Sequence, residues 1–325
     1  MSKKMFTHTY DDIISITNLL EAWQEFKRGK KNKEDVLIFE RNLMGNILEL
    51  HHELREKRYV HGVYEHFVIC DPKRRDIHKA TVRDRLLHHA IYRILYPSFD
   101  RVFIVDSFSC RNGKGTHKAM NRFRYFAGKV SKNHTRTAWV LKCDIRKFFA
   151  SINHGILLSI LKERITDKDI LWLLSRIIAS FHSTGTGVGL PLGNLTSQLL
   201  VNIYMNEFDQ YVKHVMKCKY YIRYADDFVF LSENKNYLDE VRQKSEAFLT
   251  HCLKLSLHPD KVFMCTYASG VDFLGWVHFM HHLVLRTKTK RRMIRRVSEK
   301  NVTSYLGMVS HGNGYGLVSH LKSRI

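Results

Sequence analysis

The chain has 325 residues, 44% of them apolar and only four of them proline, which is the composition of a folded globular protein and excludes a disordered one. Its 53 Lys and Arg against 31 Asp and Glu give a formal charge of +22, an excess typical of proteins that bind a polyanion. The sequence shows neither an apolar run of membrane length nor a signal peptide at residues 1–8, so we expect a cytoplasmic protein.

The cysteines and histidines exclude two common kinds of structural site. The six cysteines are scattered without a C-x-x-C pair, which argues against a zinc knuckle and against a disulfide framework. The 20 histidines show no H-E-x-x-H or similar ligand spacing.

The N-terminal part predicts helices followed by a basic hairpin. Helical periodicity with dense charge covers residues 11–57, and Gly29 predicts a break between two helices. Residues 59–70 alternate in the manner of a strand, Asp71-Pro72 predicts a turn, and residues 73–77 return as a basic partner strand.

A second helical region and a glycine-containing loop come next. Thr81 with Asp84 predicts a capped start for a helix that runs through Leu95. A basic loop with two glycines follows at residues 108–117.

The middle of the chain predicts a mixed sheet. The apolar strand 138–143 ends at Asp144, and a helix is expected to start near Asn153. The remaining expected elements are helices near 167–181, 195–217 and 236–252, a tight hairpin around 221–231, and short strands around Val262, Val271 and Leu283. Their order around the carboxylates is strand–helix–strand–strand–helix–strand, which predicts a split βαβ, ferredoxin-like sheet.

The hairpin carries the most informative residues, Asp226 and Asp227, between two apolar runs. Paired negative charge between buried strands costs free energy unless a cation compensates it. Mg²⁺ is a suitable cation, because it prefers one or two protein carboxylates together with substrate phosphates. Taken alone, Tyr-Ala-Asp-Asp at 224–227 fits an ordinary acidic turn equally well.

Asp144 adds a third carboxylate to this pair. In a ferredoxin-like sheet its strand can neighbour the hairpin, which would bring the three side chains to one edge. A nucleotidyl transferase needs such a set to hold two metal ions about 3.5–4 Å apart. Asp144 alone could equally be the N-cap of a helix.

The succession of segments resembles a reverse transcriptase across nearly the whole chain. The matching blocks, in order, are Phe103 with Ser107 and RNGKGT at 111–116, LKCDIRKFFASI at 141–152, GLPLGNLTSQ at 189–198, YADD at 224–227, LSLHPDK at 255–261 and FLGW at 273–276. The resemblance implies an α+β right-hand polymerase fold with fingers, a ferredoxin-like palm sheet and a short helical thumb. We expect N-terminal helices and fingers at 1–135, the palm at 136–277 and a basic thumb at 278–325.

The resemblance also implies the site residues. Asp144 and Asp226 would coordinate two Mg²⁺ ions, for which Mn²⁺ can substitute, with Ile145 in the metal site and Asp227 assisting at the primer terminus. Phe149 matches the gate that would clash with a ribose 2′-hydroxyl, and a core aromatic is its alternative role.

Nucleotide and nucleic-acid contacts are expected from basic and polar residues elsewhere in the blocks. Forked guanidiniums suit a triphosphate, which makes Arg74 and Arg75 candidates for the incoming nucleotide, with Lys73 as an alternative. Further nucleotide contacts are expected from Leu192, Gly193, Gln198 and Lys261. Contacts with the nucleic-acid strands are expected from Arg111, Lys114, Tyr224, Arg291, Arg292 and Arg295. The thumb arginines lie in the basic segment 286–300, whose alternative is a solvated charged face.

The fourth block departs from the pattern of many retroviral and intron-encoded enzymes, Gln-Gly followed by Ser-Pro. Here the corresponding residues are Leu192-Gly193 and Ser197-Gln198, which resemble the reverse transcriptases of diversity-generating retroelements. The hairpin 71–77, Asp84-Arg85 and the tail Ser304–Gly307 with Ser310-His311 resemble that group too.

The resemblance to that group implies an enzyme that copies a template-repeat RNA into cDNA with frequent errors at template adenines. The implied partners are template RNA, the cDNA or primer strand, dNTPs and a small basic accessory protein. Leu192 offers a physical hypothesis for the errors, because an apolar side chain cannot supply a polar check near the incoming nucleotide.

Other functions share many of these features. A group II intron-like, retron or phage-defence reverse transcriptase would use the same chemistry, although Val302-Thr303-Ser304 departs from the Val-Thr-Gly of retron enzymes. From a different class, a non-catalytic RNA-binding scaffold could keep the fold. The three carboxylates argue against a scaffold, because without catalysis their cost serves no purpose.

Overall fold

The computed structural model describes residues 6–71 and 73–323, which form two compact units. Unit 1 comprises the described residues of 1–105 with 145–211 and 247–256, and unit 2 comprises 106–144, 212–246 and the described residues of 257–325. Pro72, expected in the turn of the basic hairpin, lies outside the described residues. In the part of the chain that the structure describes, no helix is long and apolar enough to cross a membrane.

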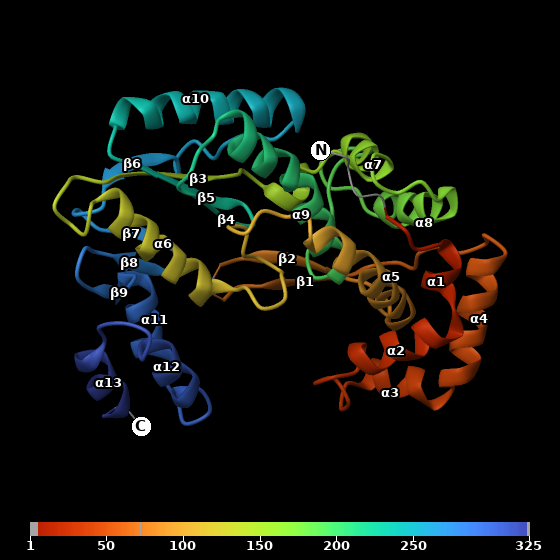
Figure 1. Ribbon diagram of the computed structural model, residues 1–325. Helices are drawn as coiled ribbons and strands as arrows, with labels where there is room; N and C mark the ends of the chain where they lie inside the picture. Colours follow the sequence, from red (N-terminus) through yellow and green to blue (C-terminus); the bar gives the residue numbers. More distant parts are fainter. Residues whose placement is uncertain (1–5, 72, 324–325) are drawn as a thin grey trace. The chain divides into compact units, whose positions relative to one another are not determined.

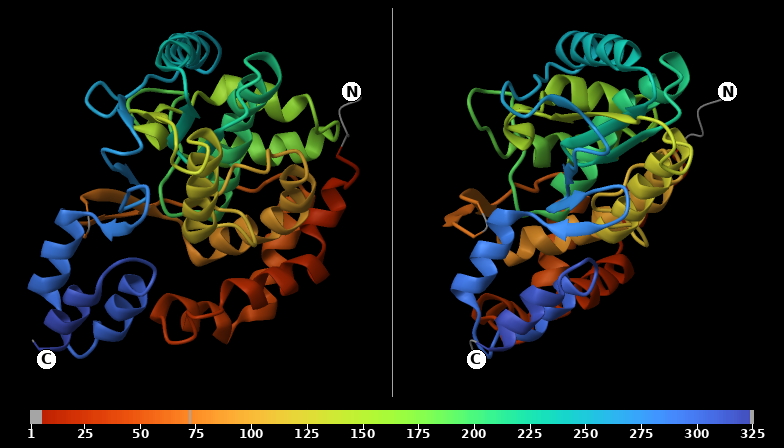
Figure 2. Two further views of the ribbon diagram at one scale, coloured as in Figure 1. Left: turned by 60° about the vertical axis from the view of Figure 1, so that its left-hand side comes forward. Right: turned by 90° about the vertical axis from the view of Figure 1, so that its left-hand side faces the viewer.

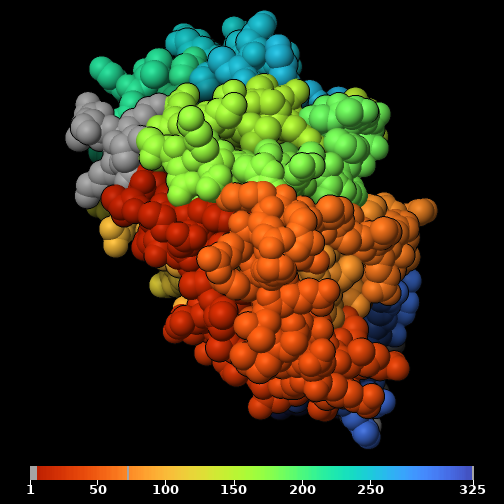
Figure 3. All heavy atoms as spheres, turned by 90° about the vertical axis from the view of Figure 1, so that its right-hand side faces the viewer, coloured from red at the N-terminus to blue at the C-terminus, as the bar shows by residue number. Residues whose placement is uncertain are grey.

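Unit 1 is mainly helical (Figure 1). Its elements are α1 (Tyr10–Ile14), α2 (Ile16–Phe26), α3 (Glu34–Arg41), α4 (Leu43–Arg55), the hairpin β1 (Glu65–Ile69) and β2 (Arg75–Lys79), α5 (Val82–Asp100), the 3₁₀ helix η1 (Phe148–Ser151), α7 (His154–Lys162), α8 (Lys168–Ala179) and α9 (Leu195–Gln210). Figure 3 looks onto one face of this unit, with α1–α4 in red and orange and α7 and α8 in green.

The first helical region is more finely divided than predicted. Four helices, α1 to α4, cover the residues 11–57 over which two were expected. Ser15 separates α1 from α2 and caps α2 by accepting the Asn18 N–H at 3.2 Å, and Asn42 separates α3 from α4. Each of these breaks is one residue long, too short to interrupt the apolar periodicity. α1 is held against α8 by the Tyr10 N–H, which donates to Asp167 at 2.8 Å.

Several predicted boundaries are confirmed and others shift. Thr81 caps α5 by accepting the Asp84 N–H at 3.2 Å, and Asn153 caps α7 by accepting the Ile156 N–H at 3.0 Å. α5 continues to Asp100, past the predicted Leu95, because its last turns still bury apolar side chains. The strand expected at 59–70 is shorter, since only Glu65–Ile69 has ladder partners.

Unit 2 contains the remaining sheets and the C-terminal helices. Its elements are α6 (Thr116–Val130), β3 (Trp139–Asp144), β4 (Tyr221–Tyr224), β5 (Asp227–Ser232), α10 (Lys235–Cys252, whose last residues belong to unit 1), β6 (Phe263–Thr266), β7 (Val271–Phe273), β8 (Trp276–His278), β9 (Leu283–Leu285), α11 (Thr287–Arg296), α12 (Val302–Val309) and α13 (Tyr315–Lys322). The helix expected near 195–217 is α9 followed by the π turn η2 (Tyr211–Val215), and β8 was not predicted.

The central sheet of unit 2 has the strand order β4-β5-β3-β6 with antiparallel neighbours, so the predicted ferredoxin-like arrangement is confirmed. Because side chains alternate along a strand, Val140, Lys142 and Asp144 of β3 share one face of the sheet. Val140 packs there against α6, while Cys143 points to the opposite face, toward charged residues of α10. In Figure 1, α10 lies above the sheet and α6 below it.

The C-terminal part of unit 2 joins a small sheet to three short helices. β7, β8 and β9 form an antiparallel sheet, and α11 to α13 pack on it through a core that includes Trp276, Leu285 and Met293. Figure 2 shows these helices in blue and violet, next to the three-stranded sheet. The helix predicted at 286–300 ends at Arg296, and Met293 is its one buried residue.

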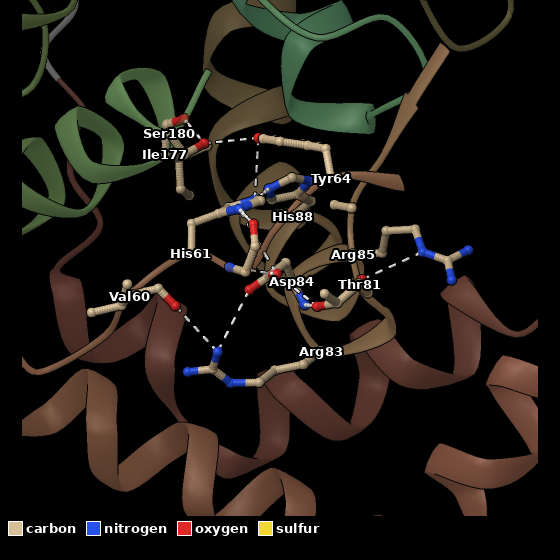
Figure 4. Close-up of polar contacts among 12 residues, drawn as sticks. Val60, His61, Tyr64, Thr81, Arg83, Asp84, Arg85, His88, Ile177 and Ser180 are labelled. Carbon is tan, nitrogen blue, oxygen red and sulfur yellow. Dashed lines mark hydrogen bonds and ion pairs between the residues drawn. The ribbon is translucent and has the colours of Figure 1, made fainter. Parts of the chain in front are cut away.

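A buried polar network fixes the segment that leads into β1 (Figure 4). Asp84, which is fully buried, accepts hydrogen bonds from the Tyr59 hydroxyl at 2.8 Å, the Gly62 N–H at 3.0 Å and the Thr81 hydroxyl at 2.6 Å. A Cβ on Gly62 would lie 2.8 Å from Asp84 Oδ2, so only glycine fits this approach. The network ties the non-ladder residues before β1 to the start of α5.

His88 extends this network into the core of unit 1. It is 1% exposed, its Nε2 lies 3.3 Å from His61 Nε2, and its Nδ1 has no hydrogen-bond partner among the described residues. Burial lowers the pKa of His88 to about 3, with His61 acting in the same direction and Asp84 against it.

We expect His88 to make the protein acid-sensitive. Its pKa is lower in the folded than in the unfolded protein, so the unfolded state binds the extra proton as the pH falls below 6.5. The free energy of unfolding should then fall by up to about 1.4 kcal/mol per pH unit toward pH 4. Urea unfolding of wild type and His88→Leu between pH 7 and 4 measures this, and parallel pH curves would contradict it.

Candidate active site

The turn between β4 and β5 presents Asp226 at the edge of the central sheet. Tyr224 pairs with Asp227, which leaves Ala225 and Asp226 as the two turn residues. Ala225 has a φ of 56°, a region that favours glycine and that the primed hairpin turns require. A non-glycine residue there costs on the order of 1 kcal/mol, and such backbone strain is often found at functional sites.

Asp144 lies directly opposite Asp227 in the ladder between β3 and β5. Directly opposed residues have Cβ atoms about 4.5–5.5 Å apart and point to the same face, so the two carboxylates are neighbours. The structure therefore brings the carboxylates of the central strand and the hairpin together, as predicted. Asp144 ends a strand and is not a helix N-cap, so that alternative is wrong.

Two lysines neutralise these carboxylates. Lys261 Nζ lies 2.8 Å from Asp144 Oδ1, and Lys142 Nζ lies 3.4 Å from Asp227 Oδ1. Burial raises the pKa of Asp227 to about 6, Lys142 opposes this rise, and Asp226 and Asp144 add to it. The two lysines therefore compensate only part of the negative charge of the three carboxylates.

The residues present fit a divalent cation that also binds substrate phosphates. In the described parts of the chain, no three His, Cys, Asp or Glu side chains converge into a complete metal-binding group, so a cation here would need further ligands from water and phosphate. Asp227 Oδ1 is a buried oxygen that accepts no hydrogen bond within those parts and has only the 3.4 Å ion pair with Lys142 beside it, so it keeps the capacity to bind a cation. Mg²⁺ typically takes one or two carboxylates and completes its shell with water and phosphate.

Sequence reasoning missed two residues that shape this site. Lys142 shares the sheet face of Asp144 because it precedes it by two positions, a spacing visible in the sequence. Arg223 is fully buried, and its guanidinium donates to Ser107 Oγ at 3.1 Å and to the Ala225 carbonyl at 3.2 Å. Arg223 therefore stabilises the strained turn through its hydrogen bond to the Ala225 carbonyl. In the sequence, an arginine inside an apolar strand is the signal that could have identified it.

We expect Lys142→Met to lower the free energy of unfolding by roughly 1–3 kcal/mol, because it leaves the half-buried Asp227 carboxylate without its cation. Adding Asp227→Asn should recover part of the loss, since the uncompensated charge is then gone. Urea unfolding of wild type, the two single variants and the double variant gives the double-mutant cycle that measures the interaction between Lys142 and Asp227. Additive losses would contradict the pairing.

The remaining nucleic-acid candidates of unit 2 lie in two places. Arg111 donates to the Ser107 carbonyl at 2.9 Å, and Lys114 Nζ lies 5.2 Å from the Phe108 ring centroid, so both belong to the loop before α6. The Tyr224 hydroxyl accepts a hydrogen bond from Thr116 at 3.1 Å, next to that loop. The thumb candidates Arg291, Arg292 and Arg295 lie together on α11.

Unit 1 holds Ile145, the sugar-gate candidate and the fourth block. Phe149 is half-buried while its neighbour Phe148 is buried, so Phe148 is the core aromatic of η1. The Phe149 carbonyl accepts the Leu190 N–H at 2.8 Å, which joins the gate segment to the fourth block. The structure thus brings Phe149 close to the block that contains Leu192, Gly193 and Gln198.

The fourth block is in turn joined to the basic hairpin. The Leu192 carbonyl accepts the His78 N–H at 3.0 Å. Gly193 has a φ of 111°, and a Cβ there would lie 2.9 Å from Ile77 Cγ2, so both conformation and space require glycine. Arg74 and Arg75 are exposed, and Arg75 begins β2, the strand that this contact anchors.

Comparison with known proteins identifies the family to which this fold and these carboxylates belong. The family model described as reverse transcriptase (RNA-dependent DNA polymerase) matches residues 71–278. The chain belongs to the reverse transcriptase family.

The curated relatives include group II intron proteins. The chain is 26% identical over 255 residues to protein YkfC of Escherichia coli K12, an alignment that covers 67% of this chain and 65% of YkfC. It is 28% identical over 148 residues to the group II intron-encoded protein LtrA of Lactococcus lactis subsp. cremoris, covering 43% of this chain and 23% of that protein. The matches therefore span less than two thirds of these relatives.

Solved structures support the fold. Telomerase from Candida albicans, in complex with the TWJ fragment of telomeric RNA, is similar with a TM-score of 0.52 at 12% identity, covering 70% of this chain and 46% of that one. Apo telomerase from Candida tropicalis, truncated from the C-terminal domain, is similar with a TM-score of 0.51 at 12% identity, covering 75% and 60%. The predicted α+β right-hand polymerase fold is confirmed.

Proposed function

We propose that this chain is an RNA-directed DNA polymerase that copies a template-repeat RNA into adenine-mutagenised cDNA, as in a diversity-generating retroelement. The observation that carries the polymerase activity is the opposed pair Asp144 and Asp227, with Asp226 in the adjoining turn. The finer, mutagenic part of the proposal is supported by the fourth block, where Leu192 and Gln198 stand in place of the common residues.

The chain's residues would act on a primer 3′-hydroxyl and a deoxynucleoside triphosphate. Asp144 and Asp226 would hold two Mg²⁺ ions, with the Ile145 backbone beside them, and Asp227 would assist at the primer terminus. When bound, such ions, or Mn²⁺ in their place, would activate the attacking hydroxyl and stabilise the charge on the leaving pyrophosphate. Lys261, whose Nζ lies 2.8 Å from Asp144 Oδ1, would contact a substrate phosphate.

Substrate selection is assigned to residues of unit 1. Phe149 would exclude a ribose 2′-hydroxyl, while Arg74, Arg75, Leu192, Gly193 and Gln198 would contact the nucleotide. Fingers at 1–135, palm at 136–277 and thumb at 278–325 are the corresponding functional domains.

The proposal extends to strands and partners. Arg111, Lys114, Tyr224 and the arginines of α11 would contact the template and the cDNA. A small basic accessory protein and a cytoplasmic location belong to the same proposal.

The test is primer extension on an RNA template of mixed sequence, followed by sequencing of the cDNA. We expect Mg²⁺-dependent extension with errors concentrated opposite adenines, and fewer such errors for Leu192→Gln, because an amide restores a polar contact. An unchanged adenine error rate in Leu192→Gln would contradict the role of that residue. Absence of extension would contradict the polymerase itself.

A group II intron-like reverse transcriptase is the second candidate, and the similarity to LtrA favours it. It predicts the same extension but errors spread over all template bases. The same cDNA sequences therefore separate the two.

A further inference from the structure

A cavity of about 310 Å³ lies in unit 2 at the end of the central sheet remote from the aspartates. Its walls come from the C-terminal end of α6, the loop before β4, the end of β5 and the start of α10. Leu231 in this wall follows Asp227 by four residues along β5, which corresponds to about 13 Å at about 3.3 Å per residue. The cavity is therefore separate from the carboxylate site.

The cavity is strongly basic. Four exposed lysines, Lys129, Lys132, Lys217 and Lys219, line it. In the described residues, none of them forms an ion pair with a carboxylate, and the one acid in the lining, Glu233, lies 3.7 Å from Arg136. Four uncompensated ammonium groups around one hollow repel each other, and a bound anion would relieve that repulsion.

Two tyrosines, Tyr220 and Tyr237, also line the cavity. The Tyr220 ring centroid is 5.4 Å from Lys219 Nζ, and Tyr237 is 37% exposed with its hydroxyl 3.2 Å from Cys218 Sγ. Proteins usually bind single-stranded nucleic acid with two kinds of side chain: lysines that contact the phosphate backbone, and an exposed aromatic ring that stacks on a base. A solvated charged face needs neither a hollow nor an exposed tyrosine.

We propose that this cavity binds a single-stranded segment of RNA, with a phosphate among Lys132, Lys217 and Lys219 and a base against Tyr237. The choice of RNA rests on the proposed RNA-templated synthesis. Lys129 is left out of the binding set because it lies in the last turn of α6, where a cation also stabilises the helix dipole.

The experiment measures binding of a 30-nucleotide single-stranded RNA by fluorescence anisotropy in EDTA, so catalysis is not required. The triple variant Lys132→Gln, Lys217→Gln, Lys219→Gln keeps unbranched side chains at Lys132 and Lys217, whose φ values are 49° and 55°. We expect about tenfold weaker binding near 0.15 M salt and a slope of log K against log salt that is shallower by about 2. Tyr237→Leu should weaken binding roughly fivefold with an unchanged slope.

The matched control removes the same charge from exposed lysines of unit 1, Lys31→Gln, Lys168→Gln and Lys254→Gln, the last also at a positive φ of 51°. We expect the control to lose less than twofold. Equal losses in both triple variants, no loss in the pocket variant, or a loss seen only with DNA of the same sequence would overturn the proposal. If the wild type failed to extend a primer, the proposed polymerase activity would be contradicted. The RNA-binding comparison would still test the cavity, because it is made without catalysis.

Discussion

Replacing Asp226 by Asn is expected to abolish primer extension on RNA, with a loss on the order of a thousandfold or more. The substitution keeps size and shape but removes a negative charge from the turn that adjoins the Asp144–Asp227 pair. A neutral carboxamide binds a divalent cation much more weakly than a carboxylate does. Without the cation, the negative charge that develops on the phosphate oxygens in the transition state would lose its main stabilisation. Single-turnover extension with saturating dNTP and Mg²⁺ measures the effect.

The control for this prediction is Asp239→Asn, the same chemical change on α10, which should extend within about twofold of wild type. RNA binding of Asp226→Asn, measured in EDTA, should also match wild type, because the defect is in chemistry. Extension by Asp226→Asn at more than a tenth of the wild-type rate would exclude the turn as the metal site. Extension in EDTA by wild type would exclude a divalent cation altogether.

Asp84→Ala should have the largest effect on stability, lowering the free energy of unfolding by roughly 3–5 kcal/mol. The change leaves the buried Tyr59 hydroxyl and Gly62 N–H without an acceptor, at about 1–3 kcal/mol each. The hydrogen bond that the Thr81 hydroxyl donates to the Asp84 carboxylate is lost as well. Urea unfolding followed by circular dichroism measures the loss.

The exposed control is Asp76→Ala on β2, where the carboxylate lies 3.1 Å from His66 on the surface. Exposed pairs contribute little, so we expect a change within about 0.5 kcal/mol. Similar losses for Asp84→Ala and Asp76→Ala would mean that the network adds nothing beyond a surface contact. Because β1 follows this network, Asp84→Ala should also increase protease cleavage near residues 59–64.

Local patterns were sufficient for much of unit 2. The apolar, β-branched and aromatic runs at 138–143 and 221–231 predicted β3, β4 and β5, since such short runs are typical of buried strands. The short strand β8 was not predicted, although β7 and β9, which are equally short, were. In unit 1, the one-residue breaks between helices were missed because they do not interrupt the apolar periodicity.

The sequence by itself determined the charge excess, the capped start of α5 at Thr81, the start of α7 near Asn153, the order of the strands and helices of the central sheet, and the three carboxylates. All of these depend on residue types at short spacing. Only the tertiary structure decided that Asp144 opposes Asp227, that Lys261 and Lys142 neutralise them, and that Asp84 is buried under Tyr59. The lysine cavity likewise joins segments far apart in the chain. The physical reason is that ladder register and burial depend on contacts between distant residues, which no local periodicity encodes.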